Sequence, residues 1–418
     1  MKRLVLLIVL GSLFIMLSPL FGTPTANSNA FFGSYLLRAN GAEAVYWNPA
    51  LLSADYQDVI LPGINQTFQI ANNSFDVDNY NYISGRYLTL KDKKMILSNV
   101  DNRLVIDGQM HMLLFGITFG NIAFSTSMHA QSEARLSKSY LKLALIGNDE
   151  TDYVFSKNNN QLNVLSYQDV TLGIGDIEIS KYMKNESIPE IRMGISASAL
   201  LGIGTLETEH YKGSFHSGMD GLAFNQDIKI KTGLGGIGTK ALLGFYSEPV
   251  NNLGVGMSFD NLFGVIRWFG STERRSYSVN ADTTYVSDLE NDIYTQVDST
   301  ETIRDFNTKL PVEMRLGAIY RYKKASLSMD WVQGFAGSVV TSSVGRICLG
   351  AEYSPIHQLP IRMGFGFGNS EYPWGISYGL GFHSKFVDCG FGFQSFKSLF
   401  PGYHSKGISF SSNLSIHY

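Results

Sequence analysis

The feature that most constrains this chain is a two-residue alternation in its C-terminal third. Large apolar side chains occupy every second position of three segments, and glycine or polar residues fill most positions between them. The apolar positions are Ile361, Met363, Phe365 and Phe367, then Ile376, Tyr378, Leu380 and Phe382, then Val387, Cys389, Phe391 and Phe393. Successive side chains point to opposite faces in β-strands, so these segments are predicted strands with one apolar face.

Soluble sandwiches and membrane barrels both contain alternating strands, and composition favours the barrel. Charged residues make up 17% of the chain, which is low for a soluble protein, and aromatic residues make up 13%. Beyond residue 30 the sequence has no apolar run long enough for a membrane-spanning helix. A closed barrel is the other arrangement that satisfies backbone hydrogen bonds in lipid. We therefore predict an all-β fold, a transmembrane antiparallel β-barrel.

The first 30 residues have the layout of a secretory signal peptide. Lys2 and Arg3 precede an apolar run over residues 4–17, and the small residues at 28–30 supply a cleavage site. The alternative is a membrane-anchoring helix, but the run is shorter than the roughly 20 residues that such a helix needs. We expect a signal peptide at 1–30 and export from the cytoplasm.

Connections between the predicted strands alternate in length. Short ones include 120–121, 183–189, 247–251, 322–324, 354–359 and 383–385, and longer ones include 71–108, 131–163, 207–223, 270–310, 334–345 and 394–406. Short periplasmic turns and long extracellular loops are typical of outer-membrane barrels. The count is about 14 strands from Asp58 onward, an even number as in single-chain bacterial barrels. The stretch 224–246 is long and glycine-rich, so it is either one kinked strand or two.

The chain ends on a strand of the same kind. Its apolar face carries Ile408, Phe410, Leu414, Ile416 and Tyr418, with Ser412 as the one interruption. A final alternating strand that ends on an aromatic residue resembles the assembly signal of bacterial outer-membrane barrels. We therefore expect the barrel assembly machinery to recognise Phe410, Leu414, Ile416 and Tyr418. The two cysteines, Cys348 and Cys389, fall on opposite faces of the predicted wall, so no disulfide is expected.

Residues 31–57 do not alternate, and they precede the predicted barrel at 58–418. They contain the run GAEAVYWNPALL from Gly41, in which Pro49 favours a turn or a helix start at Asn48. A segment of this kind at the periplasmic end of a barrel is expected to form a plug, or hatch, inside the lumen.

This run carries a family resemblance. Small residues followed by Tyr46, Trp47, Asn48, Pro49 and Ala50 resemble the hatch motif of the FadL/TodX superfamily of long-chain fatty-acid transporters, and PorV-like outer-membrane proteins start similarly. Further resemblance lies at 310–317, 330–331, 346–353 and 359–364. Members of the superfamily are barrels of 14 strands plugged by an N-terminal hatch, which agrees with the separate strand count.

The resemblance implies a function. It implies passive uptake of hydrophobic small molecules, of fatty-acid or hydrocarbon type, through a monomeric barrel in the outer membrane of a Gram-negative bacterium. Asn48, Pro49 and Ala50 would hold the hatch, and Tyr46 and Trp47 would line the path. The alternative is a structural or secretion-associated barrel, PorV-like, that binds protein partners through its extracellular loops.

Other functions find little support in the sequence. The net charge is −3 without a basic stripe, so no nucleic-acid partner is expected. The histidines show no ligand spacing, so neither a metal nor another cofactor is expected. The run GLGGIG at 233–238 matches a dinucleotide fingerprint by spelling, but a predicted strand follows it where the fingerprint needs a helix. No arrangement of catalytic residues stands out, and an enzyme is not expected. One helix is predicted at 89–100, with Thr89 as its N-cap.

Overall fold

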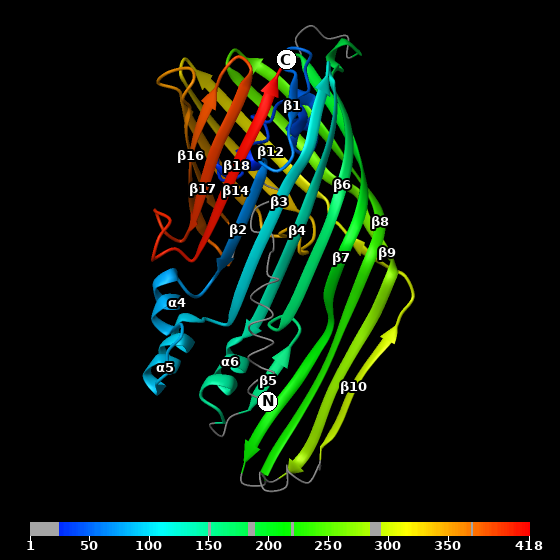
Figure 1. The fold of residues 1–418 in the computed structure, drawn as a ribbon, viewed down its shortest axis with the longest axis vertical. Helices are drawn as coiled ribbons and strands as arrows, with labels where there is room; N and C mark the ends of the chain where they lie inside the picture. The colour runs from blue at the N-terminus through cyan, green and yellow to red at the C-terminus, as the bar shows by residue number, and fades with distance from the viewer. Residues whose placement is uncertain (1–24, 149–151, 183–188, 219–220, 285–293, 369–370) are drawn as a thin grey trace.

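The computed structural model describes residues 25–148, 152–182, 189–218, 221–284, 294–368 and 371–418. Within them the chain forms a closed antiparallel β-barrel that holds a short helical segment in its lumen (Figure 1). Most of the predicted signal peptide, residues 1–24, lies outside the described residues. In the described ranges, no helix is long and apolar enough to cross a membrane.

The barrel wall has 14 strand positions in the described residues, as predicted. Its main strands are β2 (Gln66–Asn72), β3 (Arg103–Phe119), β4 (Ile122–Ser137), β6 (Gln161–Glu178), β7 (Ile191–Gly218), β8 (Gly221–Val250), β9 (Leu253–Thr284), β12 (Glu313–Tyr322), β13 (Ala325–Gly334), β14 (Arg346–Tyr353), β15 (Ile361–Phe367), β16 (Trp374–His383), β17 (Val387–Phe396) and β18 (Gly407–His417). Strand β18 pairs with β17 on one side and with β2 on the other, and this pairing closes the barrel.

Four shorter strands continue these positions. Strand β1 (Asp58–Ile60) extends β2 between β18 and β3, and β5 (Tyr153–Ser156) extends β6 beside β7. Strands β10 (Thr295–Thr302) and β11 (Phe306–Lys309) pair with β9 beyond the end of its pairing with β12. The first strand begins at Asp58, the position predicted from the sequence.

Most of the predicted short connections are confirmed and meet at one end of the barrel, while residues 183–188 lie outside the described residues. Strand β3 turns into β4 at Gly120 and Asn121, where Phe119 pairs with Ile122 and Gly120 has a φ of +63°. The turns after β12, β14 and β16 lie at the same end, which we call the short-turn end, and so does the C-terminus (Figure 1).

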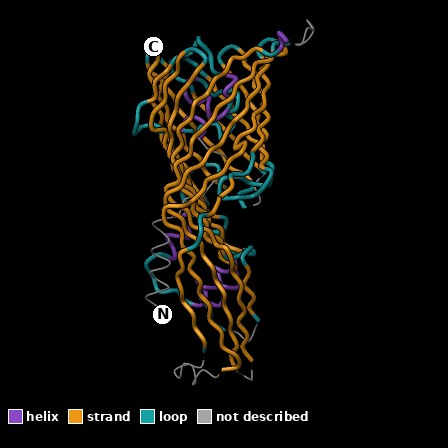
Figure 2. The backbone as a smooth tube through the Cα atoms, turned by 90° about the vertical axis from the view of Figure 1, so that its right-hand side faces the viewer, coloured by secondary structure: helices purple, strands orange, loops and turns teal. Residues whose placement is uncertain are grey.

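Two of the predicted long loops are wrong. Residues 207–223 and 270–310 are largely strand, because β7, β8 and β9 run for 28, 30 and 32 residues and carry a sheet beyond the barrel with β10 (Figures 1 and 2). Every residue of β10 is exposed. Polar side chains occupy both faces of this extension, so its strands lack the apolar alternation that reveals strands in lipid. The stretch 224–246 lies in the single strand β8, which kinks at Gly235, where φ is +65°.

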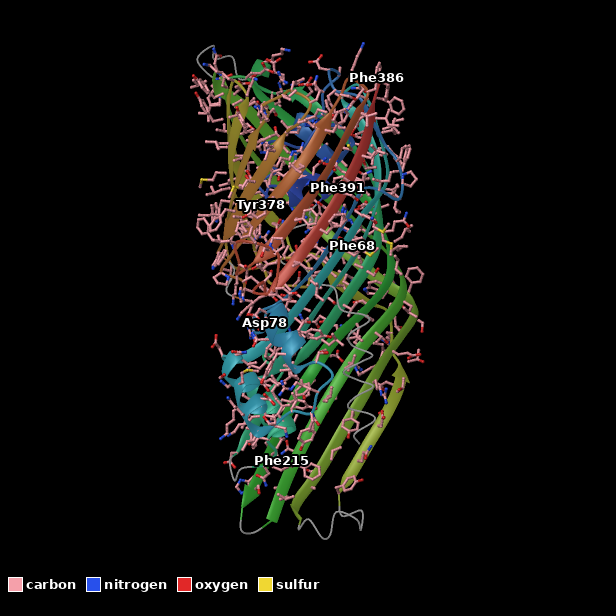
Figure 3. The ribbon with its side chains drawn as sticks, turned by 60° about the vertical axis from the view of Figure 1, so that its left-hand side comes forward. Phe68, Asp78, Phe215, Tyr378, Phe386 and Phe391 are labelled. Atoms are coloured by element: carbon pink, nitrogen blue, oxygen red, sulfur yellow. The ribbon has the colours of Figure 1, made fainter. Side chains whose placement is uncertain are left out.

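The outer face of the barrel is apolar. Phe68, Tyr378 and Phe391 point away from the wall (Figure 3), and Phe68 and Phe391 are 40% and 54% exposed. An apolar surface of this extent is stable against lipid rather than water. On β18, Phe410 and Ile416 are on this exposed face, as predicted for the closing strand, and Tyr418 directly after the strand is also exposed.

Glycine and small polar residues face the lumen, which holds the N-terminal segment. Residues 25–57, which we call the hatch, contain α2 (Ala26–Asn29), η1 (Gly41–Glu43), α3 (Ala44–Trp47) and η2 (Pro49–Leu51). The remaining helices lie in connections: α4 (Val77–Ile83), α5 (Leu90–Asn99), α6 (Lys138–Leu145) and η3 (Ser180–Tyr182). Helix α5 confirms the predicted helix, and Thr89 and Asp92 form its capping box.

Both cysteines are free thiols. Cys348 is buried against the hatch, and its sulfur lies 3.8 Å from the position that a Cβ would take at Gly33. Cys389 lies on β17, two residues before the outward-facing Phe391.

Candidate functional site

The predicted hatch motif forms a capped turn against the wall. Asn48 is extended, with φ −154° and ψ 95°, and its side-chain oxygen accepts a hydrogen bond from the backbone N–H of Ala50 at 3.2 Å. The side-chain amide of Asn48 donates to the carbonyl of Phe245 on β8 at 3.0 Å. Pro49 occupies the first position of η2, where its missing N–H costs nothing. This geometry fits a holding role for the three residues, which stays a prediction.

Glu43 joins the parts of the hatch to one another. Its Oε2 accepts hydrogen bonds from the Tyr35 hydroxyl at 3.0 Å, from the Asn27 amide at 3.2 Å and from the Thr25 hydroxyl at 3.4 Å. Burial raises the pKa of this carboxyl group to about 7, although the three hydrogen bonds act in the opposite direction. The start of the hatch is therefore tied to its middle through one buried acid.

The wall offers the hatch a seat made of glycine. At eleven glycines on β3, β6, β7, β8, β9, β15, β16 and β17, an added Cβ would lie less than 3.0 Å from a hatch atom. These are Gly116, Gly173, Gly175, Gly194, Gly244, Gly256, Gly364, Gly366, Gly375, Gly379 and Gly392. At Gly194, for example, the added atom would lie 2.3 Å from the carbonyl carbon of Pro49. The glycines that alternate with outward aromatic residues therefore make room for the hatch backbone.

Serines on the wall complete the seat. The hydroxyls of four wall serines donate to hatch carbonyls at 2.7–2.9 Å: Ser125 to Ala42, Ser196 to Val45, Ser377 to Ala30 and Ser411 to Ala26. A buried carbonyl without a partner would cost about 1–3 kcal/mol. The short polar residues on the lumen face therefore satisfy an irregular backbone at close range.

Trp47 lies against a buried ionic cluster. The Arg315 guanidinium lies 4.7 Å from the Trp47 ring centroid, and it is 2.8 Å from Glu313 and 3.5 Å from Asp260. Lys240 is 3.7 Å from Asp260. The Trp47 indole N–H donates to the Thr25 hydroxyl at 3.2 Å. Buried charges need such partners, so the cluster fixes Arg315 beneath the ring.

Tyr46 is bound to a second polar cluster. Its hydroxyl donates to Asp169 Oδ1 at 2.8 Å, and His129 Nε2 lies 2.8 Å from the other oxygen of Asp169. Tyr46 and Trp47 are 4% and 2% exposed, so both are packed into the interior here. Their role in lining a path stays a prediction.

The sequence pattern did not single out Asp169, His129 or Arg315. Each is a polar residue at a position of its strand that faces the lumen. The alternation of polar and apolar positions along these strands is the signal from which they could have been identified. Their grouping could not be found in that way, because it depends on which strands face each other across the hatch.

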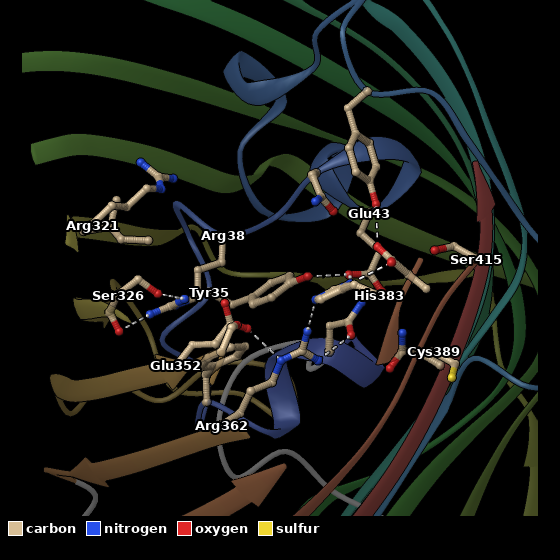
Figure 4. A pocket seen from close by; sticks show the side chains of 18 of the residues that line it. Tyr35, Arg38, Glu43, Arg321, Ser326, Glu352, Arg362, His383, Cys389 and Ser415 are labelled. Atoms are coloured by element: carbon tan, nitrogen blue, oxygen red, sulfur yellow. Dashed lines mark hydrogen bonds and ion pairs between the residues drawn. The ribbon is translucent and has the colours of Figure 1, made fainter. Parts of the chain in front are cut away.

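Polar cavities lie on both sides of the hatch. The first, which we call the vestibule, has about 640 Å³ and lies at the short-turn end (Figure 4). Its lining includes Arg38, Glu43, Arg321, Glu352, Arg362 and His383. The second has about 650 Å³ and lies toward the long connections, with Arg103, Glu133, Lys231 and Glu371 in its lining.

The connection 335–345 folds into the barrel. Val339 and Val340 pack against an interior cluster that includes Trp268 and Leu310, and Thr341 is buried. Val340 and Thr341 line the second cavity, and they also border the ionic cluster around Arg315. The sequence predicted a loop here, but not that it turns inward. Within the described ranges, no group of three or more His, Cys, Asp or Glu side chains could hold a metal ion.

The fold resembles that of solved transporters. The toluene transporter TbuX of Ralstonia pickettii is 12% identical, with 96% of this chain and 99% of that chain covered and a TM-score of 0.48. The P. putida toluene transporter TodX is 9% identical, with 95% of this chain and 97% of that chain covered and a TM-score of 0.48. A TodX deltaS2S3 mutant monoaromatic hydrocarbon channel is 9% identical, with 95% of this chain and 99% of that chain covered and a TM-score of 0.50. At 9–12% identity this likeness concerns the fold alone.

Sequence comparison gives a family without an assigned activity. No curated protein matches the chain. A family model described as "Family of unknown function (DUF5723)" matches residues 49–260, which is half of the chain and runs from Pro49 of the hatch motif to Asp260 of the ionic cluster. The chain belongs to this family of unknown function, DUF5723.

Proposed function

We propose that this protein is an outer-membrane channel that admits hydrophobic small molecules, with the hatch controlling their passage. The observation that carries the proposal is the position of the hatch, which fills the lumen between two cavities of about 640 and 650 Å³. The seat of eleven glycines shows that the wall is fitted closely to this separate segment.

The fold supports the same class of function. The structural match with a TM-score of 0.50 is to a mutant monoaromatic hydrocarbon channel, and at 9% identity the likeness concerns the fold alone. Short turns face the periplasm in outer-membrane barrels, so the vestibule opens toward the periplasm and the extended sheet projects from the cell.

Passage through the lumen requires the hatch to move. Wall and hatch are in contact at the glycine seat, which leaves no room for a ligand between them. Small displacements of α3 and η2 would break the contacts of Tyr46 with Asp169 and of Asn48 with Phe245. These two contacts are hydrogen bonds that water can replace, so we propose that they separate without unfolding the wall.

A reversible cross-link tests this proposal. The Ser34 and Ser328 hydroxyls are 2.9 Å apart, so cysteines at both positions are close enough for a disulfide between hatch and β13. Cys348 and Cys389 are first replaced by alanine. In proteoliposomes we expect uptake of radiolabelled oleate and toluene to fall on oxidation and to recover on reduction. Ser328→Cys alone, treated with the same oxidant, is the control. Equal uptake by empty and protein-containing liposomes would contradict the transport proposal.

A second candidate is a barrel that binds protein partners outside the cell. The sheet formed by the outer parts of β7, β8, β9 and β10 favours it, because this sheet extends beyond the wall and exposes all of β10. Shortening the β7–β8 hairpin would separate the two functions. If the protein is a channel, the shortened variant retains uptake in proteoliposomes. If it is a scaffold, neither form shows uptake above that of empty liposomes, and the shortened form loses its partner.

A further inference from the structure

Charges are segregated in the vestibule. Arg38 of the hatch and Arg321, Lys323 and Lys324 of β12 and its turn lie on one side of the cavity. The acids Glu43, Asp58 and Asp388 line the part formed by η1, β1 and β17. Figure 4 shows Arg38 and Arg321 close to Ser326, and Glu43 on the side of Ser415. Glu352 of β14 also lines the cavity and acts on Arg38, but it is paired with Arg362, so the cavity has a side where basic groups predominate.

Two guanidinium groups on this side are bound only to neutral acceptors. Arg38 donates to the hydroxyls of Ser326 and Ser328 at 2.8 and 2.9 Å, and Arg321 donates to the carbonyl of Leu37 at 3.3 Å. Among the described residues, neither guanidinium lies within 4.0 Å of a carboxylate oxygen. Arg362 differs, because its Nε lies 2.9 Å from Glu352.

Burial disfavours the charged form of Arg38. The pKa of Arg38 is lowered to about 10, because burial lowers it by more than the nearby Glu352 and Asp330 raise it, and the positive charges of Arg362 and Arg321 act in the same direction as burial. Like charges that converge in a partly desolvated cavity favour an added counter-charge. Guanidinium groups bind carboxylate and phosphate oxygens through paired N–H donors.

We propose that the basic side of the vestibule binds a small organic anion that carries a carboxylate or phosphate group. The anion enters from the short-turn end, and Arg38 and Arg321 contact its charged group. A cavity of about 640 Å³ has the size of ordinary small-molecule sites. The hatch forms the floor of this site and donates Arg38 to it. This inference does not depend on transport, because the site exists with the hatch in place.

Binding to the purified full-length mature protein tests the proposal. Citrate is the carboxylate probe, inorganic phosphate is the phosphate probe, and glycerol is the neutral control, each titrated by calorimetry in detergent. We expect saturable binding of at least one anion, none of glycerol, and weaker binding as sodium chloride rises, because salt screens the attraction. Loss of one charge-assisted contact in Arg321→Gln should weaken binding about tenfold.

Matched variants keep the result interpretable. Arg192→Gln removes an arginine that lies on β7 and outside the vestibule lining, and that is already paired, 3.3 Å from Asp176. It should bind as the unaltered protein does. Arg321→Lys keeps the charge and should recover part of the affinity, whereas a purely structural role would not follow charge. Equal affinity in Arg321→Gln and Arg192→Gln, or no saturable binding of either anion, would overturn the proposal.

The source of the anion is a separate arm of the test. The same phosphate group could belong to a free solute or to a lipid headgroup. Competition by phosphatidylglycerol nanodiscs, but not by phosphatidylcholine nanodiscs, supports the site with a lipid as its ligand. Binding of citrate or phosphate that both kinds of nanodisc leave unchanged supports the site with a free anion.

Discussion

At the scale of single residues, Glu43 makes the seating of the hatch depend on pH. Its pKa rises from 4.5 to about 7 in the folded state, so the folded hatch holds this proton more tightly than an unfolded one. The stabilisation is present in full below about pH 4.5 and is lost as pH rises through 7. We expect the hydrogen-exchange protection factors of residues 25–57, corrected for the intrinsic exchange rate at each pH, to be higher at pH 5 than at pH 8, with a difference of up to ~3 kcal/mol.

The variant Glu43→Gln isolates this contribution. Its neutral amide keeps the size of the side chain without titrating, so the difference between pH 5 and pH 8 should shrink. The other buried acids are unchanged in this variant, so the pH dependence that remains measures their contribution. The same pH dependence in both proteins would show that Glu43 is not the group responsible.

A single methyl group should disturb the glycine seat. In Gly194→Ala the new Cβ would lie 2.3 Å from the Pro49 carbonyl carbon and 2.4 Å from the Ala50 nitrogen, both backbone atoms with little freedom to move. Overpacking of this kind costs about 1–3 kcal/mol. We expect faster proteolysis of the hatch while the heat-modifiable migration of the barrel is kept. Gly204→Ala lies on the same strand, 3.3 Å from a Leu234 methyl group, and should behave like the unaltered protein.

At the scale of elements, the environment of each strand decided whether the sequence revealed it. Strands β15 to β18 place aromatic residues in lipid and glycine or serine against the hatch, so their alternation is plain in the sequence. The outer parts of β7, β8 and β9 carry polar side chains on both faces and are held by backbone pairing and by ion pairs such as Arg275 with Asp298. No periodic pattern follows from such contacts, and a loop was predicted instead.

The start of the hatch gives a prediction about processing. Thr25 binds Glu43 and Trp47, and the wall serine Ser411 donates to the carbonyl of Ala26, so residues before Phe31 are part of the packed hatch. We predict that the mature chain retains Thr25 to Ala30, which places cleavage earlier than the boundary at 30 expected from the small residues. N-terminal sequencing or intact mass of the purified protein checks this. A mature chain that begins at Phe31 would contradict it.

At the scale of the whole molecule, the wall and the hatch were predictable to different degrees. The alternation and the even strand count require a closed wall, and an apolar, non-alternating segment ahead of it points to a plug. The contacts of the plug were not predictable, because Asp169, Phe245 and Arg315 meet Tyr46, Asn48 and Trp47 across 123, 197 and 268 residues of sequence. Only closure of the barrel brings these positions together.

The division between wall and hatch yields the last prediction. Strand β18 is held by β17, β1 and β2, none of which belongs to the hatch, so the wall should close without residues 25–57. We expect a protein lacking these residues to conduct ions in planar bilayers many times better than the complete protein, because its lumen is polar. If conductance stays low, the inward connection 335–345 is the barrier, and its additional removal should open the pore. A double deletion that inserts as a folded barrel and still does not conduct would show that the wall itself closes the lumen.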